Sequence, residues 1–183
     1  MQTLTGQLLV AAPSLKAPEF EASVVLMVQH DEAGALGVVI NRPLEMTIDE
    51  AWQQVSEVPC PREDALHEGG PCEGPLMVVH TEPAYSELSV SEGIYFCTDK
   101  EHIEWLVRDD EPKMKFVIGY AGWAPGQLEQ ELAQGAWLTV PATEARVFDD
   151  AESWDSLVQC ASQTSGILKD VNPRIIPIDP TMN

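Results

Sequence analysis

The segment Gly119–Leu138 constrains the fold of this 183-residue chain more than any other part of it. It has the pattern of a strand end, a tight Gly/Pro turn, one short helix and the start of another strand. Pro125 suits the first helical turn, where the N–H that proline lacks would have no partner. Gly135 suits the left-handed position just past a helix end. We therefore expect a strand–turn–helix–strand unit here.

The same segment could bind an anion, because a Gly-rich turn that enters a helix exposes backbone N–H groups. It contains no Lys or Arg, however, and Glu129 and Glu131 already bring negative charge. These residues favour a structural turn that braces the fold. Trp123 and Gln127 remain candidates for a surface role.

Short apolar runs separated by turns predict a mostly antiparallel sheet. Ser23–His30 and Ala35–Ile40 are joined by Asp31–Gly34, a connection of hairpin length and too short for a parallel crossover. The other expected strands are Leu8–Ala12, Leu76–His80, Gly93–Cys97, Met114–Tyr120, Ala136–Val140 and Ala145–Phe148. No strand–helix alternation runs the length of the chain. We therefore expect an α+β fold, with a curved, largely antiparallel sheet, in a single domain over residues 1–183.

Helix signals are fewer. Thr47 and Glu50 have the spacing of a capping box, which opens a helix whose apolar face extends to Val55. A second helix is expected from Asp99 through Arg108. A last one is expected over about 151–162, followed by an extended tail from Gly166 that contains Pro173, Pro177 and Pro180 and packs on the body through Ile175, Ile176 and Ile178.

Charge limits the classes of partner. Thirty acidic and ten basic residues give a formal net charge of −20, and the ten cations are scattered. Affinity for nucleic acid comes largely from Lys and Arg that neutralise phosphates, so direct nucleic-acid binding is not expected. Docking on anionic lipid is disfavoured for the same reason. Self-repulsion that keeps the protein soluble is the simplest interpretation.

The four cysteines lie far apart and form no C-x-x-C pair, so neither a zinc site nor a redox dithiol is expected. Reduced thiols, no signal-peptide pattern at the N-terminus and no apolar run of membrane-spanning length lead us to expect a cytoplasmic protein. His30 and His80 each end an apolar strand. With Cys72 or Cys97 they could ligate a metal, but a hydrogen-bonded histidine at the edge of the core fits the spacing better.

Two polar segments are further candidates for binding. Arg42, which follows Asn41, could hold an internal carboxylate or recognise an anion in a cleft. Gly69 and Gly70 follow His67-Glu68, which could form a base and its orienting partner beside a flexible loop. A tight turn between elements is the alternative, and the absence of a nucleophile at motif spacing favours it.

The chain resembles the AlgH/YqgE family of uncharacterised bacterial proteins over nearly its whole length. The matching pieces, in order, are Gly6–Leu15, Phe20–Val28, Gly34–Pro43, Glu68–Pro71, Leu76–His80, Gly119–Leu132 and Trp137. Ala12 stands where the family often has Thr, and Cys72 where it usually has Val, so Cys72 is a poor candidate for a shared function. The resemblance implies a compact α+β domain with a sheet folded toward a pseudo-barrel. Some members are labelled transcriptional regulators, and the family has no firmly assigned reaction.

Two hypotheses of function follow. G-x-S-x-G, G-x-x-x-x-G-K-S/T and H-E-x-x-H are all absent, so we expect a non-enzymatic regulatory or interaction protein that acts through protein partners. Its candidate surface comprises Asn41, Arg42, Gly69, Gly70, His80, Trp123 and Gln127. The alternative is an enzyme or small-ligand binder whose cleft gathers Arg42, His80 and Gln127. Neither hypothesis calls for a cofactor or a metal, and both leave the oligomeric state open.

Overall fold

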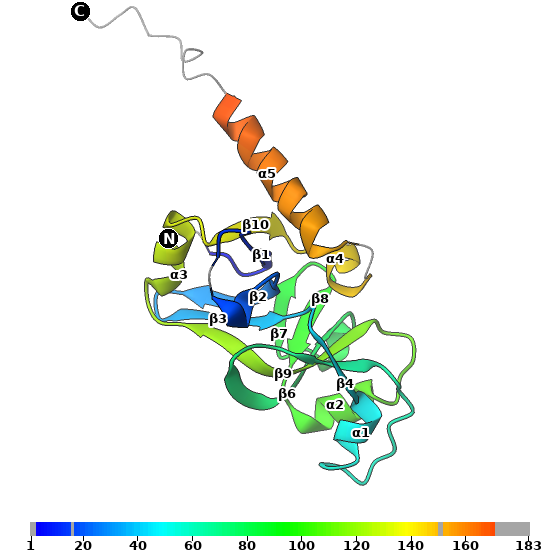
Figure 1. Ribbon diagram of the computed structural model, residues 1–183. Coiled ribbons are helices and arrows are strands. Elements are labelled where there is room, and N and C mark those ends of the chain that lie inside the picture. Colours follow the sequence, from blue (N-terminus) through cyan, green and yellow to red (C-terminus); the bar gives the residue numbers. More distant parts are fainter. Residues whose placement is uncertain (1–2, 16, 150–151, 171–183) are drawn as a thin grey trace, which may run out of the picture.

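The computed structural model describes residues 3–15, 17–149 and 152–170, and it has the expected α+β fold (Figure 1). The strands are β1 (Gln7–Ala11), β2 (Val24–Asp31), β3 (Gly34–Val39), β4 (Pro43–Thr47), β5 (Ala65–Glu68), β6 (Cys72–His80), β7 (Leu88–Ser91), β8 (Ile94–Cys97), β9 (Met114–Trp123) and β10 (Trp137–Pro141). The helices are α1 (Ile48–Trp52), α2 (Lys100–Leu106), α3 (Gln127–Ala133), α4 (Glu144–Phe148) and α5 (Trp154–Asp170), with short 3-10 turns at Pro18–Phe20 and Pro83–Tyr85.

The strands form one curled sheet in the order β10-β1-β2-β3-β9-β6-β8-β7, with β5 branching from β9 and β4 pairing with β5. The described ladders are antiparallel except for the parallel pair β5–β9. The curl brings β7 close to the residue before β1, since a Cβ built on Gly6 would lie 2.8 Å from the carbonyl oxygen of Val90. No ladder joins β7 to β10 among the described residues, so the sheet stays open.

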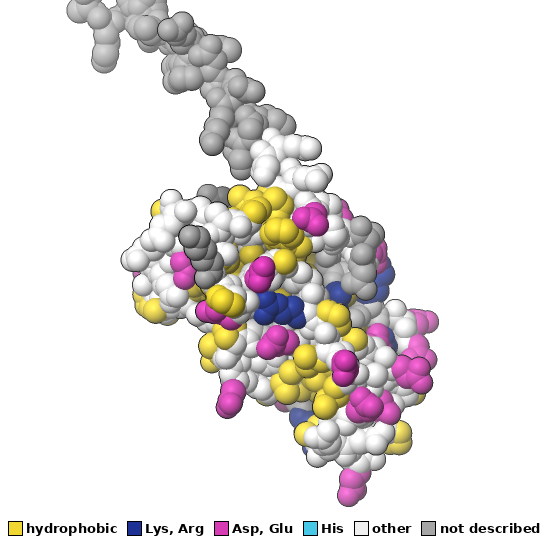
Figure 2. Space-filling view, in the orientation of Figure 1, with side chains coloured by type: hydrophobic (Ala, Val, Ile, Leu, Met, Phe, Trp, Pro, Cys, Tyr) yellow, Lys and Arg dark blue, Asp and Glu magenta, His cyan; other side chains and the backbone are white. Residues whose placement is uncertain are grey.

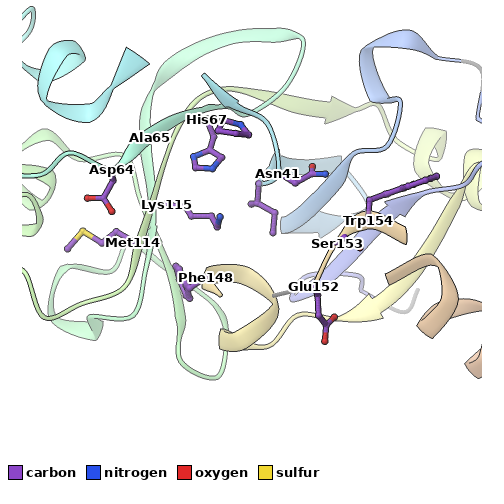
Figure 3. A pocket seen from close by; sticks show the side chains of 12 residues that line it. Asn41, Asp64, Ala65, His67, Met114, Lys115, Phe148, Glu152, Ser153 and Trp154 are labelled. Atoms are coloured by element: carbon purple, nitrogen blue, oxygen red, sulfur yellow. The ribbon is translucent and has the colours of Figure 1, made fainter. Parts of the chain in front are cut away.

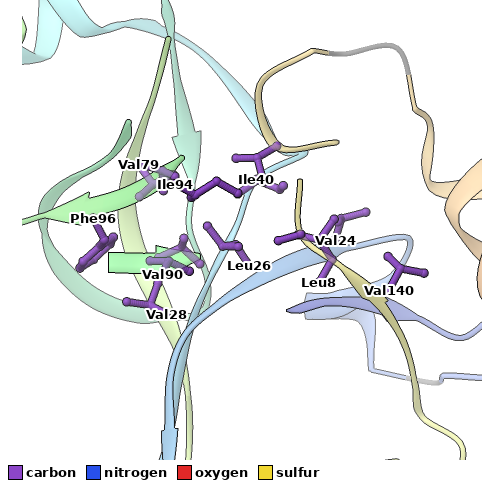
Figure 4. Close-up of a cluster of buried hydrophobic side chains, with 14 of the residues drawn as sticks. Leu8, Val24, Leu26, Val28, Ile40, Val79, Val90, Ile94, Phe96 and Val140 are labelled. Carbon is purple, nitrogen blue, oxygen red and sulfur yellow. The ribbon is translucent and has the colours of Figure 1, made fainter. Parts of the chain in front are cut away.

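The inner face of the curled sheet holds the largest core cluster. Leu8, Val24, Leu26, Ile94 and Phe96 face one another there, and Figure 4 shows them with neighbours from several strands. Two further clusters cover the outer face, one under α1 and α2 and one under α3. Full burial of a Val, Leu, Ile or Phe side chain contributes about 1.5–3 kcal/mol, so these layers supply most of the favourable free energy of folding.

Local patterns located the hairpin correctly. β2 and β3 pair antiparallel from Val25↔Val39 to Asp31↔Gly34, and the chain reverses between Asp31 and Gly34. The capping box is also present, with the Thr47 side chain on the Glu50 N–H and the Glu50 side chain on the Thr47 N–H. The helix ends at Trp52, however, and Val55 is exposed instead of buried.

The structure differs from the sequence-based expectations in three places. Ala145–Phe148 belongs to the helix α4, which Thr143 caps by accepting a hydrogen bond from Arg146 N–H, and not to a strand. β4 and β5 lie where no strand was expected. The tail was expected to be extended from Gly166, but α5 continues to Asp170. The expected packing of Ile175, Ile176 and Ile178 lies outside the described residues.

The first turns of α5 lie against the sheet and its later turns project from the body (Figure 1). The Trp154 indole N–H donates to the carbonyl oxygen of Ala11 at 2.8 Å, which fixes the start of the helix on β1. Leu157 and Ala161 are buried in the inner cluster. α5 and α4 therefore cover one end of the curled sheet.

Candidate functional site

The unit expected over Gly119–Leu138 has its polar centre at Glu131. Glu131 Oε2 accepts the indole N–H groups of Trp123 at 2.9 Å and of Trp137 at 2.8 Å. Its Oε1 accepts the Gln127 side-chain amide at 2.9 Å. Trp123 is 6% exposed and stacks on Phe20. Trp123 is therefore a buried part of the fold, and of the two retained candidates only Gln127 reaches the surface.

Asn41 and Arg42 tie neighbouring segments together. Asn41 Oδ1 accepts the Val24 N–H at 2.8 Å, and its amide donates to the Ala22 carbonyl at 2.8 Å. The Arg42 guanidinium donates to the carbonyl oxygens of Glu19 and Glu21. Its Nη1 lies 3.8 Å from Glu68 Oε2, an ion pair without a hydrogen bond. One of the two expectations was that Arg42 holds an internal carboxylate. Its principal partners are main-chain carbonyls instead.

Gly69 and Gly70 mark a close crossing of two main chains. The Gly69 N–H donates to the Ile118 carbonyl at 2.8 Å, and the Gly69 carbonyl accepts the Val39 N–H at 2.8 Å. A Cβ on Gly69 would lie 2.1 Å from the Gly119 carbonyl oxygen, and one on Gly70 would lie 2.3 Å from the Tyr120 carbonyl carbon. Only glycine lets the chain pass this close to β9.

The two histidines expected at strand ends are buried. His80 is fully buried, its Nδ1 accepts the Glu82 N–H at 3.3 Å, and burial lowers its pKa from 6.5 to about 4. His30 Nδ1 accepts the Leu4 N–H at 3.1 Å and its Nε2 lies 2.9 Å from Glu129 Oε1. No three His, Cys, Asp or Glu side chains of the described residues are placed to hold a metal ion together.

Arg42, His80 and Gln127 therefore serve different parts of the fold. Arg42 binds the segment before β2, His80 is buried near Tyr95, and Gln127 caps the turn before α3. These contacts do not bring the three residues together in the expected cleft. Two other hollows, which were not predicted from the sequence, are better candidates for a binding site.

The first is a cavity of about 420 Å³ beside α4 and the start of α5 (Figure 3). Its polar lining includes His67, which is 9% exposed, and Lys115, which is 8% exposed. The β5–β9 register places Leu66 opposite Phe116 and His67 opposite Val117. Because strand side chains alternate between faces, Lys115 and His67 share the face away from Phe116.

Two carboxylates that line this cavity each form an ion pair with one arginine. Asp64 Oδ2 lies 2.8 Å from Arg62 Nε, and Glu152 Oε2 lies 3.1 Å from Arg146 Nε. Figure 3 shows Asn41 and Trp154 across the cavity from His67 and Lys115. A buried lysine within an apolar strand pattern, Met114-Lys115-Phe116-Val117, is the signal that could have located this site from sequence.

The second site is a shallow groove of about 540 Å³ over β4, β6 and β9, called here the apolar groove. It is lined by Leu44, Glu68, Gly70, Pro71, Cys72, Glu73, Gly74, Ile118 and Gly119. Leu44 is 39% and Ile118 is 41% exposed, and Met46, two residues along β4, is 41% exposed. Figure 2 shows hydrophobic side chains gathered over these strands with acidic side chains around them.

The fold and these sites define an α+β protein with an open, curled sheet, an apolar groove and a separate polar cavity. The chain belongs to the AlgH-like family, whose model matches residues 8–165. A UPF0301 protein of Xanthomonas campestris pv. campestris is 39% identical over 155 residues, which are 81% of this chain and 82% of that protein. A UPF0301 protein of Chlorobaculum tepidum is 35% identical over 151 residues, which are 79% of each chain.

Solved structures agree with this assignment. The solution structure of the AlgH protein from Pseudomonas aeruginosa is similar with a TM-score of 0.72 and 29% identity, over 94% of this chain and 98% of that one. A crystal structure of a Corynebacterium diphtheriae protein is similar with a TM-score of 0.67 and 28% identity, over 87% and 88% of the two chains. The membership expected from the sequence motifs is confirmed.

Among the described residues, no helix is both long and apolar enough to span a membrane.

Proposed function

We propose that this chain is a non-enzymatic interaction protein that acts through a protein partner and binds that partner in the apolar groove. The exposure of Leu44 and Ile118 beside the same hollow is the observation that supports this most strongly. Single exposed apolar residues are ordinary, whereas an apolar patch with a polar rim is typical of an interaction site. Gly70 of the expected motif surface lines the groove, and Arg42 contacts its edge through Glu68.

The biological role in this proposal is regulatory and indirect. A net charge of −20 favours a protein partner over nucleic acid, because few cations are present to neutralise phosphates. We also propose a cytoplasmic location, which the four separate thiols support.

Recovery of the partner from native cells tests the proposal. Tagged chain is purified under native conditions as wild type, as the double variant Leu44→Ser/Ile118→Ser, and as the control Leu88→Ser. Leu88 is 42% exposed on β7, away from the groove, so the control removes an equally exposed leucine. We expect a stoichiometric partner with the wild type and the control, and its loss with the double variant. Free chain alone in every case, or a partner retained by the double variant, would contradict the proposal.

A small-ligand binder is a second candidate, and the cavity in Figure 3 supports it. Its volume falls within the range of ligand sites, and it holds both a buried lysine and a buried histidine. A thermal-shift screen with small carboxylates, phosphates and nucleotides tests it, since a ligand at 100 times its Kd adds about 2.7 kcal/mol of stability. Lys115→Met should abolish the shift, and Lys113→Met, at the exposed position two residues earlier, should keep it. A shift that persists in Lys115→Met would place the ligand elsewhere.

A further inference from the structure

The rim of the apolar groove is acidic. Glu68 and Glu73 both line it, and the Glu68 side chain is 53% exposed, with Arg42 at 3.8 Å as its one ion-pair partner among the described residues. Glu73 is exposed, and its side chain makes no hydrogen bond or ion pair with a described residue. Figure 2 shows acidic side chains on several sides of the hydrophobic patch. A partner that covers this groove must therefore meet carboxylates as well as apolar side chains.

We propose that the groove holds a segment of a partner protein in which apolar side chains are flanked by Lys or Arg. The inference rests on the proposed function and adds the chemistry of the partner to it. Apolar side chains of the segment lie against Leu44, Pro71 and Ile118, and its cations lie over Glu68 and Glu73. Complementary charge of this kind raises the association rate and rejects acidic competitors.

A second copy of this chain is a poor occupant. Each copy carries a net charge of −20, and a symmetric contact through this face would bring two acidic rims together. Like charges facing each other oppose association. A basic segment of another protein meets no such repulsion.

The shape of the groove indicates how the segment docks. Gly70, Gly74 and Gly119 line the groove, so part of its surface is main chain. β4 pairs with β5 at Pro43↔His67 and at Thr47↔Ala65. Between these two pairs, β4 has three residues where β5 has one, Leu66, so β4 bulges. A bulge of this kind bends an edge strand away from regular pairing. The partner therefore binds through its side chains and not as an added β-strand.

A library of random 12-residue peptides displayed on phage tests this chemistry. The full chain is immobilised, and peptides are kept when they bind wild type and the Leu88→Ser control but not Leu44→Ser/Ile118→Ser. All three proteins have the same net charge, so unspecific attraction of basic peptides is equal and is subtracted. Synthetic copies of the selected peptides are then titrated against wild type and against Glu68→Gln/Glu73→Gln at two salt concentrations.

We expect the selected peptides to carry Leu, Phe or Trp flanked by Lys or Arg. Glu68→Gln/Glu73→Gln should weaken their binding about tenfold, equivalent to 1.4 kcal/mol, and higher salt should weaken wild-type binding more than variant binding. Selected peptides with acidic or uncharged flanks would overturn the basic partner and leave the groove as a docking site. Failure to obtain any peptide that depends on Leu44 and Ile118 would count against both the inference and the proposed function.

Discussion

One carboxylate, Glu131, organises the polar interior of the turn–helix unit. Two buried indoles and one surface amide donate to it. The indoles of Trp123 and Trp137 are packed edge to face at 6.1 Å, and Phe20 contacts both rings. A buried N–H without an acceptor costs about 1–3 kcal/mol, so the position of this carboxylate determines whether the aromatic cluster can stay buried.

We therefore predict that Glu131→Ala destabilises the protein by about 2–4 kcal/mol, because it leaves two buried indole N–H groups without an acceptor. Gln127→Ala removes two exposed hydrogen bonds, one donated to Glu131 and one accepted from the Ala124 N–H, and should cost only about 1 kcal/mol. Urea denaturation followed by tryptophan fluorescence measures both. Equal effects from the two variants would show that the indoles find other acceptors.

His80 gives a prediction about pH. Its pKa is about 4 in the fold because burial disfavours the charged ring, whereas the ordinary value is 6.5. Between these values the unfolded chain binds a proton that the folded chain does not, so stability falls as pH drops from 6.5 to 4. The difference corresponds to about 3 kcal/mol. At pH values above 6.5 the group contributes nothing to the pH dependence.

Unfolding free energies of wild type and His80→Gln at pH 7 and pH 4.5 isolate this effect from the carboxylates, which both proteins share. The variant should lose less stability on acidification than the wild type. An imidazole signal of His80 that titrates near 6.5 in the folded protein would contradict the explanation.

At the scale of elements, the crossing of the β5–β6 connection over β9 depends on glycine. A Cβ on Gly69 would meet the Gly119 carbonyl oxygen, and neither main chain can move without breaking the Gly69–Ile118 hydrogen bond. We predict that Gly69→Ala costs more than about 3 kcal/mol or prevents folding. Gly126→Ala is the matched control, since Gly126 has φ +76 but no atom within 4 Å of the new Cβ. It should cost only about 1–2 kcal/mol, for the left-handed backbone. Urea midpoints of the two variants decide the point.

Elements that depend on neighbours in sequence could be predicted. The β2–β3 hairpin and the Thr47–Glu50 capping box are set by contacts within a few residues. β5 could not be predicted, because it pairs with β9 about fifty residues later, and β4 pairs in turn with β5. The sequence favours a strand at Ala145–Phe148, where the structure has the helix α4, because four residues are too few for periodicity to separate helix from strand.

The candidate sites show the same division. The motif residues Arg42, Gly69 and Trp123 were found from sequence, but the structure uses them to join segments and pack the core. Ile118 lies in an apolar strand, and such a pattern predicts a core residue. In the structure Ile118 is exposed, because its face of β9 is left uncovered by the described elements, and the sequence alone does not indicate this. Likewise, Lys115 and His67 share a face only because β5 pairs parallel to β9.

At the scale of the whole molecule, acidic charge dominates. The ion pairs among the described residues involve Arg42, Arg62, Lys113 and Arg146, and most of their acidic partners are partly exposed. Such pairs contribute about 0–1 kcal/mol each to stability. With thirty acidic residues against ten basic ones, repulsion among carboxylates outweighs these pairs. Net repulsion of this kind destabilises the compact state.

Salt screens this repulsion, so we predict that the melting temperature rises as NaCl increases from about 10 to 300 mM, where the Debye length shortens from about 30 Å to below 8 Å. The variant Glu45→Lys/Glu73→Lys lowers the net negative charge at two exposed positions and should show a smaller rise. Both proteins experience the same effect of NaCl on water, so the difference between their slopes reports screening alone. A melting temperature that falls with salt would mean that the ion pairs, and not the excess of carboxylates, control the electrostatic stability. The steering of a basic segment to the apolar groove would then have to arise from Glu68 and Glu73 alone, since the field of the whole chain would be too weak to contribute.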